Sequence, residues 1–163
     1  MIPKEVTIYT DGACIGNPGP GGYGAMLLYG KHRKELSGGF RLTTNNRMEI
    51  LAAVEALKAL KHPCKVTLYS DSQYLVHAIS KNWLSKWQSR NWRKYNKQPV
   101  LNVDLWQEML EQLNKHQVTF HWVKGHNGIP ENERCDALAM AAAQQPGLPP
   151  DMAYEQSKSR PTG

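Results

Sequence analysis

Two aspartates, Asp11 and Asp71, each end a stretch of nearly the same sequence. The residues leading to them read VTIYTD over Val6–Asp11 and VTLYSD over Val66–Asp71. Both stretches alternate apolar and polar side chains, which is typical of a strand, and a helical segment separates them. Such a connection favours parallel pairing, which would place the two carboxylates about 4.8 Å apart at the backbone. Because ligands of open α/β sheets bind beyond such strand ends, the pair indicates a shared site rather than two ordinary strand terminators.

Two further carboxylates could join this site, but the local sequence gives each an ordinary alternative. Asn46–Glu49 fits a capping box, in which Glu49 only satisfies a backbone N–H at a helix start. Asp136 lies mid-helix beside an apolar face, where a solvated helix surface is the common explanation. Adjacent anions are unfavourable unless a cation neutralises them, and oxygen ligands select hard cations such as Mg²⁺ or Mn²⁺. The residue types therefore predict a divalent cation at Asp11 and Asp71.

A loop rich in glycine and proline, GNPGPGG at residues 16–22, follows the first of these stretches. Glycine-rich loops can cradle phosphates, but no Gly-Lys-Ser/Thr sequence follows this one, which excludes a nucleotide P-loop. The local pattern by itself indicates a turn between two strands.

The charge balance favours a polyanionic partner. The chain has 163 residues, a net charge of +6 and a pI of about 9.3. Residues 81–98 contain six basic residues and no acid: Lys81, Lys86, Arg90, Arg93, Lys94 and Lys97. Clustered like charges are unfavourable unless they meet a polyanion, and a solvated charged helix is the alternative. Trp83 and Trp87 lie one helical turn apart in the same segment, which favours packing against each other.

The distribution of apolar residues and cysteines bears on the cellular compartment of the protein and on its covalent cross-links. No apolar run is long enough to cross a membrane and no signal peptide is recognisable, so we expect a cytoplasmic protein without membrane contact. Cys14, Cys64 and Cys135 lie far apart and form no Cys-x-x-Cys pair, which argues against a zinc site or a disulfide framework.

The elements that would position these residues alternate between strands and helices. Strands are predicted at 4–10, 23–29, 32–42, 65–70 and 117–123, and helices at 46–60, 73–79, 82–87, 103–113 and 130–143. This order predicts one α/β domain over residues 1–143, with an antiparallel meander followed by helix-connected strands. Residues 144–163 are rich in proline, glycine and serine, which predicts a disordered tail.

Five motifs, in order and spacing, resemble those of bacterial type 1 ribonucleases H, and the likeness runs from Val6 to about Ala143. They are TDGAC with GNPG at residues 10–19, TNNRME at 44–49, SDSQY at 70–74, WVKGH at 122–126 and NERCD at 132–136. The resemblance implies a ribonuclease H-like fold. Its five-stranded mixed sheet has a three-strand antiparallel meander, two parallel strands and helices on both faces.

The resemblance also implies the chemistry. Asp11, Glu49, Asp71 and Asp136 would be the catalytic, metal-binding carboxylates, which replaces the capping role of Glu49. Two Mg²⁺ ions, bound with the substrate and replaceable by Mn²⁺, would support hydrolysis of the RNA strand of RNA–DNA hybrids. The products would carry 5′-phosphate and 3′-hydroxyl ends. His126 would be a further catalytic residue, as a proton shuttle or an aid to product release.

Contacts to the RNA–DNA hybrid follow from the same resemblance. One set would approach the RNA strand or the minor groove: Cys14, Asn17, Asn45, Asn46 and Gln73. Thr44 would contact a DNA phosphate, and the alternative for Asn46 is a helix cap. A second set matches the basic protrusion that grips the DNA strand in this family: Lys86, Trp87, Arg90, Trp92, Arg93 and Lys94.

Two other functions compete with this one. A non-catalytic hybrid-binding module would gain nothing from four carboxylates facing phosphates. Another nuclease or strand transferase could share this type of sheet, but the Lys124–His126 loop and the basic segment favour a type 1 ribonuclease H. We expect a monomer, and the sequence indicates no protein partner for the tail.

Overall fold

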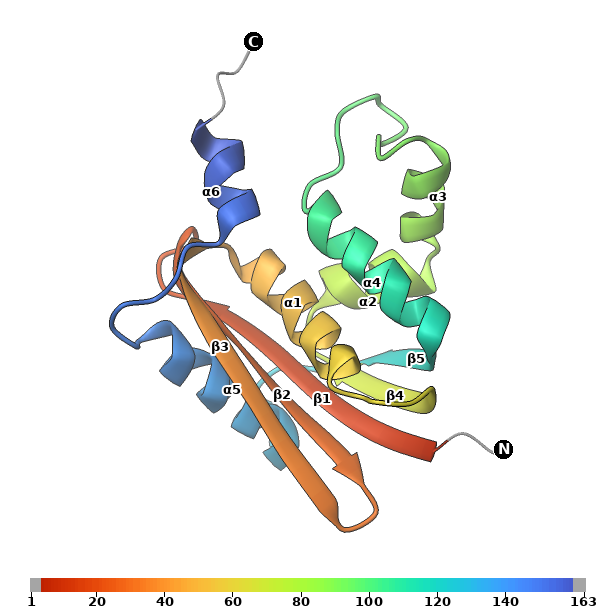
Figure 1. Ribbon diagram of the computed structural model, residues 1–163, viewed down its shortest axis with the longest axis vertical. Coiled ribbons are helices and arrows are strands. Elements are labelled where there is room, and N and C mark those ends of the chain that lie inside the picture. The colour runs from red at the N-terminus through yellow and green to blue at the C-terminus, as the bar shows by residue number, and fades with distance from the viewer. Residues whose placement is uncertain (1–3, 160–163) are drawn as a thin grey trace.

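The structure is a computed structural model that describes residues 4–159. Its centre is a five-stranded sheet with the strand order β3-β2-β1-β4-β5 (Figure 1). The strands are β1 (Lys4–Cys14), β2 (Gly19–Tyr29), β3 (His32–Thr43), β4 (Cys64–Ser70) and β5 (Gln117–Trp122). The helices are α1 (Asn45–Lys58), α2 (Gln73–Ser80), α3 (Trp83–Ser89), α4 (Val103–Lys115), α5 (Pro130–Ala143) and α6 (Met152–Ser159).

The two halves of the sheet differ in strand direction. β1 pairs with β2, and β2 with β3, in antiparallel fashion, whereas β1 pairs with β4, and β4 with β5, in parallel. The predicted meander followed by helix-connected strands is therefore confirmed. The strand boundaries differ most at the end of β1, which extends to Cys14 rather than Thr10, and at the start of β2, which begins at Gly19 rather than Tyr23. Half of the glycine-rich loop is thus strand, because glycine and proline do not prevent pairing at this end of the sheet.

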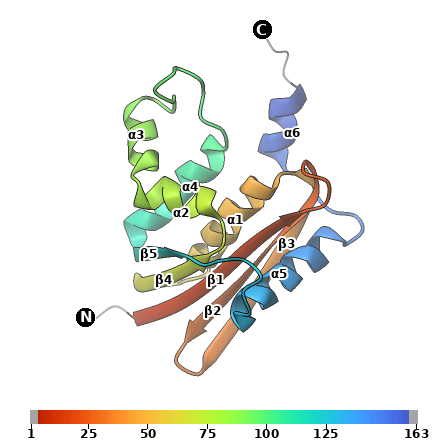
Figure 2. The same cartoon turned by 180° about the vertical axis from the view of Figure 1, so that it is seen from behind.

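Helices cover both faces of the sheet, as the family resemblance implied. Figure 1 shows α1 and α4 in front of the sheet, and Figure 2 shows α5 across β1, β2 and β3 on the back. None of the helices in the described part of the chain is long and apolar enough to cross a bilayer.

The core between the sheet and α1 fixes the position of that helix. Ile8 of β1 pairs with Leu68 of β4, and both are fully buried. Val54 and Leu57 of α1 are equally buried in the same cluster. Each such side chain stabilises the fold by about 1.5–3 kcal/mol relative to an exposed one. The core therefore holds α1, which carries Glu49, against β1.

Helix α5 lies directly on the backbone of β2. A side chain at Gly22 would collide with the carbonyl oxygen of Ala139, and one at Gly24 with that of Cys135. The absence of side chains at these positions lets the helix approach closely. The close approach of α5 to β2 also determines how far Asp136, which belongs to α5, lies from the sheet.

The C-terminal segment differs from the prediction of disorder. Residues 144–151 return along β3, where Arg41 donates a backbone hydrogen bond to the Pro149 carbonyl oxygen at 2.9 Å, and α6 follows. Asp151 and Tyr154 are only 7% and 6% exposed. Composition misled the prediction because the contacts that order the segment, two buried side chains and the ion pair of Asp151, are non-local. The rest of the predicted tail, residues 160–163, lies outside the described residues.

Candidate active site

The parallel register of β1 and β4 brings the two aspartates together. Val6 lies opposite Val66 and Thr10 opposite Ser70, so the matching sequences pair position for position. Asp11 and Asp71 follow at the same level of the sheet. The predicted meeting of these two carboxylates is confirmed.

Glu49 of α1 joins them. One carboxylate oxygen from each of Asp11, Glu49 and Asp71 lies within 4.8 Å of the other two. Asp11 and Glu49 are buried, at 4% and 3% exposure, and Asp71 is half-buried. The backbone N–H of Gly12 donates to both Asp11 Oδ1 and Glu49 Oε1, each at 2.9 Å. The geometry thus offers a small cage of oxygen atoms that opens toward Asp71.

The capping interpretation of Glu49 is wrong. The N-cap of α1 is Thr44, whose Oγ1 accepts a hydrogen bond from the backbone N–H of Arg47 at 3.2 Å. Asn46 is inside the helix, so its capping alternative fails as well. Glu49 reaches instead to Gly12, which is 37 residues away and could not be identified from a local pattern.

Asp136 lies on the wall of the same recess, which has a volume of about 480 Å³. It comes from α5, on the opposite face of the sheet from α1 (Figure 2). Four carboxylates from four elements therefore border one hollow, with three of them in the tight group. No lysine or arginine lines this recess among the residues described.

The electrostatics of the group favour a bound cation. Burial, together with the Asp71 and Asp136 carboxylates, raises the pKa of Asp11 well above its usual value, although hydrogen bonds oppose the shift. Burial and the neighbouring Asp11 charge likewise raise the pKa of Glu49. Glu49 Oε2 is buried and has no hydrogen-bond partner. An all-oxygen donor set with an unsatisfied buried oxygen fits a hard divalent cation, which would relieve both problems.

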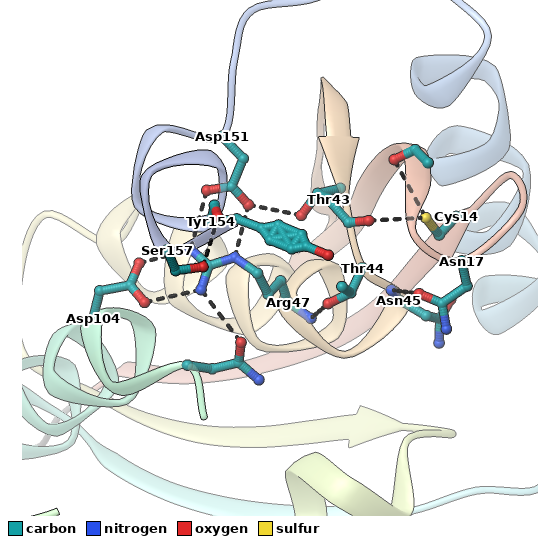
Figure 3. A network of polar contacts seen from close by, with 12 residues as sticks. Cys14, Asn17, Thr43, Thr44, Asn45, Arg47, Asp104, Asp151, Tyr154 and Ser157 are labelled. Carbon is teal, nitrogen blue, oxygen red and sulfur yellow. Dashed lines mark hydrogen bonds and ion pairs between the residues drawn. The ribbon is translucent and has the colours of Figure 1, made fainter. Parts of the chain in front are cut away.

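Several predicted nucleic-acid contacts line the carboxylate recess. They are Cys14, Asn45, Asn46 and Gln73. Asn17 and Thr44 lie just outside it, on a neighbouring groove that Asn46 also borders. In Figure 3 the Asn17 side chain accepts a hydrogen bond from the backbone N–H of Asn45 at 3.0 Å, which ties the glycine-rich loop to the start of α1. The structure therefore brings this predicted set together.

His126 is exposed on the loop between β5 and α5 and also lines the recess. The loop passes close to Asp71, since a side chain at Gly125 would meet Asp71 Oδ2 at 2.7 Å. His126 has a φ of 55°, a left-handed conformation that costs energy outside glycine. Its imidazole is thus placed at the mouth of the site.

The basic residues lie elsewhere, on α3 and the loop that follows, which project beyond the sheet (Figure 1). Lys86, Arg90, Arg93 and Lys94 are exposed, and none forms an ion pair with an acid within residues 4–159. The cations are therefore free to meet phosphates.

The tryptophans of this segment have a different environment from its cations. The Trp83 and Trp87 rings lie 6.2 Å apart, and Trp87 lies 6.0 Å from the fully buried Trp106. Trp92 is also half-buried against the core. The predicted packing of Trp83 on Trp87 is confirmed, so these rings support the segment that presents the cations.

Tyr74 and Asn102 were not identified from the sequence. Tyr74 lines the carboxylate recess, and its hydroxyl accepts hydrogen bonds from Asn102 Nδ2 at 3.2 Å and Trp106 Nε1 at 3.3 Å. Asn102 lines the neighbouring groove with Thr44. The only available signal was the position of Tyr74 directly after Gln73. The 28-residue separation of Tyr74 from Asn102 hid their contact.

Comparison with known proteins agrees with this geometry. The profile of the RNase H family matches residues 3–144. Ribonuclease H of Desulforamulus reducens is 61% identical over 149 residues, which cover 91% of this chain and 94% of that protein. Ribonuclease H of Symbiobacterium thermophilum is 66% identical over 139 residues, covering 85% and 95%.

Solved structures agree as well. LC9-RNase H1, described as a type 1 RNase H with the type 2 active-site motif, has a TM-score of 0.79 and 31% identity, covering 98% of this chain and 83% of that one. LC11-RNase H1, solved in complex with an RNA/DNA hybrid, has the same fold, with a TM-score of 0.66 and 22% identity over 85% of this chain and 96% of that one. With its profile, its relatives and its carboxylate site in agreement, the chain belongs to the RNase H family.

Proposed function

We propose that the protein is an endonuclease that hydrolyses the RNA strand of RNA–DNA hybrids and leaves 5′-phosphate and 3′-hydroxyl ends. The observation that carries the proposal is the cluster of three carboxylates from Asp11, Glu49 and Asp71 in a chain of the RNase H family. One oxygen of this cluster, Glu49 Oε2, is buried without a hydrogen-bond partner. The names of the curated relatives and the hybrid complex of LC11-RNase H1 support the choice of substrate.

The residues that would hold the cations are Asp11, Glu49, Asp71 and Asp136, and we propose two Mg²⁺ ions, with Mn²⁺ as a substitute. When bound with substrate, such a pair activates a water and stabilises charge on the phosphate and on the leaving oxygen. Gly12 holds the Glu49 carboxylate in place through its backbone N–H. Asp71 and Asp136 are half-buried, so substrate can approach them more easily than the buried Asp11 and Glu49.

Other side chains would bind, orient and exchange protons. Asn45, Asn46 and Gln73 border the recess, where amides can recognise base edges and 2′-hydroxyls in a minor groove. His126, at the mouth, can move a proton to or from solvent as product leaves. The exposed cations after α3 would bind phosphates of the DNA strand through charge, independently of sequence.

A non-catalytic hybrid-binding module is the alternative from another functional class. Its phosphate-binding surface would be weakened by the buried carboxylates, because their charge repels phosphates. The monomeric state and the cytoplasmic location stay predictions from the sequence.

One assay separates these possibilities. A hybrid, a DNA duplex and an RNA duplex of the same sequence, each end-labelled, are incubated with the protein, with and without Mg²⁺. We expect cleavage only of the RNA strand in the hybrid and only with the cation, with product ends assigned by sensitivity to phosphatase. Binding of the hybrid without cleavage would support the binding module instead. Cleavage of duplex DNA would overturn the substrate class.

A further inference from the structure

A second hollow lies beside the carboxylate recess, on the other side of the start of α1. It has a volume of about 870 Å³. Asn17 and Thr44 line one part of it, and Tyr154 and Ser157 of α6 line another (Figure 3). Lys158 of the same helix also lines this groove. Asn46 borders both this groove and the carboxylate recess. The C-terminal helix thus forms a wall opposite two residues implicated in hybrid binding.

A buried ion pair fixes this wall. Asp151, directly before α6, accepts hydrogen bonds from Arg47 Nε at 2.7 Å, Arg47 Nη2 at 3.1 Å and Thr43 Oγ1 at 2.7 Å (Figure 3). Arg47 belongs to the first turn of α1 and is 5% exposed. Breaking a buried pair of this kind is strongly unfavourable, so α6 starts from a fixed point.

A second tie lies along β3. The Arg41 guanidinium forms two hydrogen bonds to Glu155 Oε1, at 2.8 and 3.2 Å, and one to Oε2 at 3.1 Å. The Tyr154 side chain is buried on the inner side of the same helix. Together these contacts set the direction of α6, and with it the position of its exposed side chains.

Lys158 is the cation of this wall that no acid among the described residues neutralises. Arg47 faces two carboxylates, Asp104 and Asp151, so that cluster has a net negative charge and Lys158 is the residue of the groove that can attract a phosphate. Lys158 forms no ion pair within residues 4–159, and its ammonium group lies 5.3 Å from the centre of the Tyr154 ring. The side chain is exposed.

We propose that the C-terminal helix α6 is part of the substrate-binding surface, and that Lys158 contacts a phosphate of the DNA strand of the hybrid. The inference rests on the proposed function. Asn46 separates the carboxylate recess from the groove. If the RNA strand lies in the recess, the DNA strand of the same duplex lies on the other side of Asn46, which is the position of the groove. A lysine and hydroxyl and amide groups are suited to a phosphate backbone and carry no sequence preference.

The first test replaces one charge and measures binding and chemistry separately. Lys158→Gln should raise KM for the hybrid about two- to fivefold at low salt, as expected for one exposed charge contact, and leave kcat unchanged. The slope of log affinity against log salt should flatten by roughly 0.7–0.9. Lys158→Arg should restore both values.

Lys31→Gln is the matched control, because Lys31 is exposed at the β2–β3 turn, at the opposite end of the molecule from α6 (Figure 1). It should leave KM and the salt slope unchanged. Thermal unfolding of the Lys158 variants would detect any loss of α6 packing. If Lys158→Gln behaves like Lys31→Gln, the inference is wrong, even though the wild type cleaves hybrids. If the wild type cleaves no hybrid, the proposed function itself fails.

The second test locates the phosphate. A single uncharged methylphosphonate linkage is moved along the DNA strand of a short hybrid, and in a second series along its RNA strand. Affinity is measured for the wild type and for Lys158→Gln. At one position of the DNA strand, the losses of affinity caused by Lys158→Gln and by the uncharged linkage should not be additive, because each change removes the same interaction. Additive effects at every DNA position, or coupling to a linkage in the RNA strand, would overturn the assignment.

Discussion

The carboxylate of Glu49 accepts a hydrogen bond from the backbone N–H of Gly12 at 2.9 Å, and the two residues lie so close that no side chain fits between them. A Cβ at residue 12 would lie 2.5 Å from the backbone nitrogen of Glu49 and 2.6 Å from the carbonyl carbon of Met48. Both of these atoms belong to the backbone of α1, which cannot avoid the clash by a change of rotamer as a side chain could.

Gly12→Ala should therefore push α1 away from β1. We expect a loss of stability of about 1–3 kcal/mol, as for other overpacked sites, and a near-complete loss of cleavage. Gly30→Ala serves as the control, because Gly30 has open space but a φ of 57°, so it should lose some stability and keep its activity. Thermal unfolding and specific activity measure the two effects. A fully active Gly12→Ala variant would contradict this arrangement.

Asp71→Asn should preserve the fold and hybrid binding while abolishing nearly all cleavage. The side chain is half-buried, and the amide keeps its shape but removes a charge from the cation site. Turnover in Mg²⁺ and hybrid affinity should be measured on one preparation. Glu111→Gln, an exposed acid on α4, should leave both unchanged. Near-normal turnover of Asp71→Asn would refute the metal site.

His126→Ala should have a smaller effect. A general acid–base group typically contributes about 10²–10⁴-fold to the rate, and His126 lies at the mouth rather than among the buried carboxylates. We expect the turnover number of His126→Ala to decrease by a factor within that range or by a smaller one. The dependence of the rate on Mg²⁺ concentration should be unchanged. Titrating Mg²⁺ against turnover for both proteins tests this. An unchanged turnover number would make His126 a bystander.

Asp11 should make the cation-free protein less stable as the pH rises. Burial and the neighbouring carboxylates raise its folded-state pKa above the ordinary value of 3.8. Above pH 3.8 the unfolded chain releases the proton while the folded chain retains it, so stability falls with increasing pH until the folded group also ionises. In a chelator, Asp11→Asn should thus unfold at a higher temperature than the wild type near neutral pH.

The same comparison has two internal checks. The stability advantage of Asp11→Asn should shrink toward zero as the pH falls to about 3, where both states of the wild type are protonated. Mg²⁺ should stabilise the wild type more than the variant, because a ligand of the folded state raises stability by mass action. If Asp11→Asn is no more stable than the wild type in a chelator at about pH 7, the electrostatic account is wrong.

The basic segment should control affinity rather than chemistry. Replacing Lys86, Arg90, Arg93 and Lys94 together by Gln should raise KM strongly and flatten the salt slope by roughly 0.7–0.9 for each phosphate that is no longer neutralised. The turnover number at saturating hybrid should change much less. Trp87→Ala should differ by also lowering thermal stability, because its ring packs against Trp83 and Trp106. An unchanged KM in the quadruple variant would show that these cations are a solvated surface.

Much of the fold could be predicted because its signals are local and repeated. The near-identity of Val6–Asp11 and Val66–Asp71 predicted the parallel register that the structure has along β1 and β4. Glu49 could not be assigned in this way. Its local sequence fits a cap, and only the resemblance to ribonucleases H, not the residues themselves, pointed to the site.

The C-terminal segment shows where sequence reasoning failed. Composition predicted disorder after residue 143, whereas Asp151 is held by Arg47 across 104 positions of the chain. An interaction at that separation leaves no mark on local composition. The same limitation hid the groove that α6 forms with Asn17 and Thr44.

The four carboxylates of the site come from β1, α1, the end of β4 and α5, and the outermost two, Asp11 and Asp136, are far apart in the chain. A refolding intermediate with a complete sheet but an undocked α5 would lack one of the four. Contacts between distant segments form slowly, because chain entropy must be given up before they stabilise anything. The recovery of cleavage during refolding would therefore follow the slowest of these docking steps. If that step is the docking of α5 on β2, cleavage activity would return later than the secondary structure.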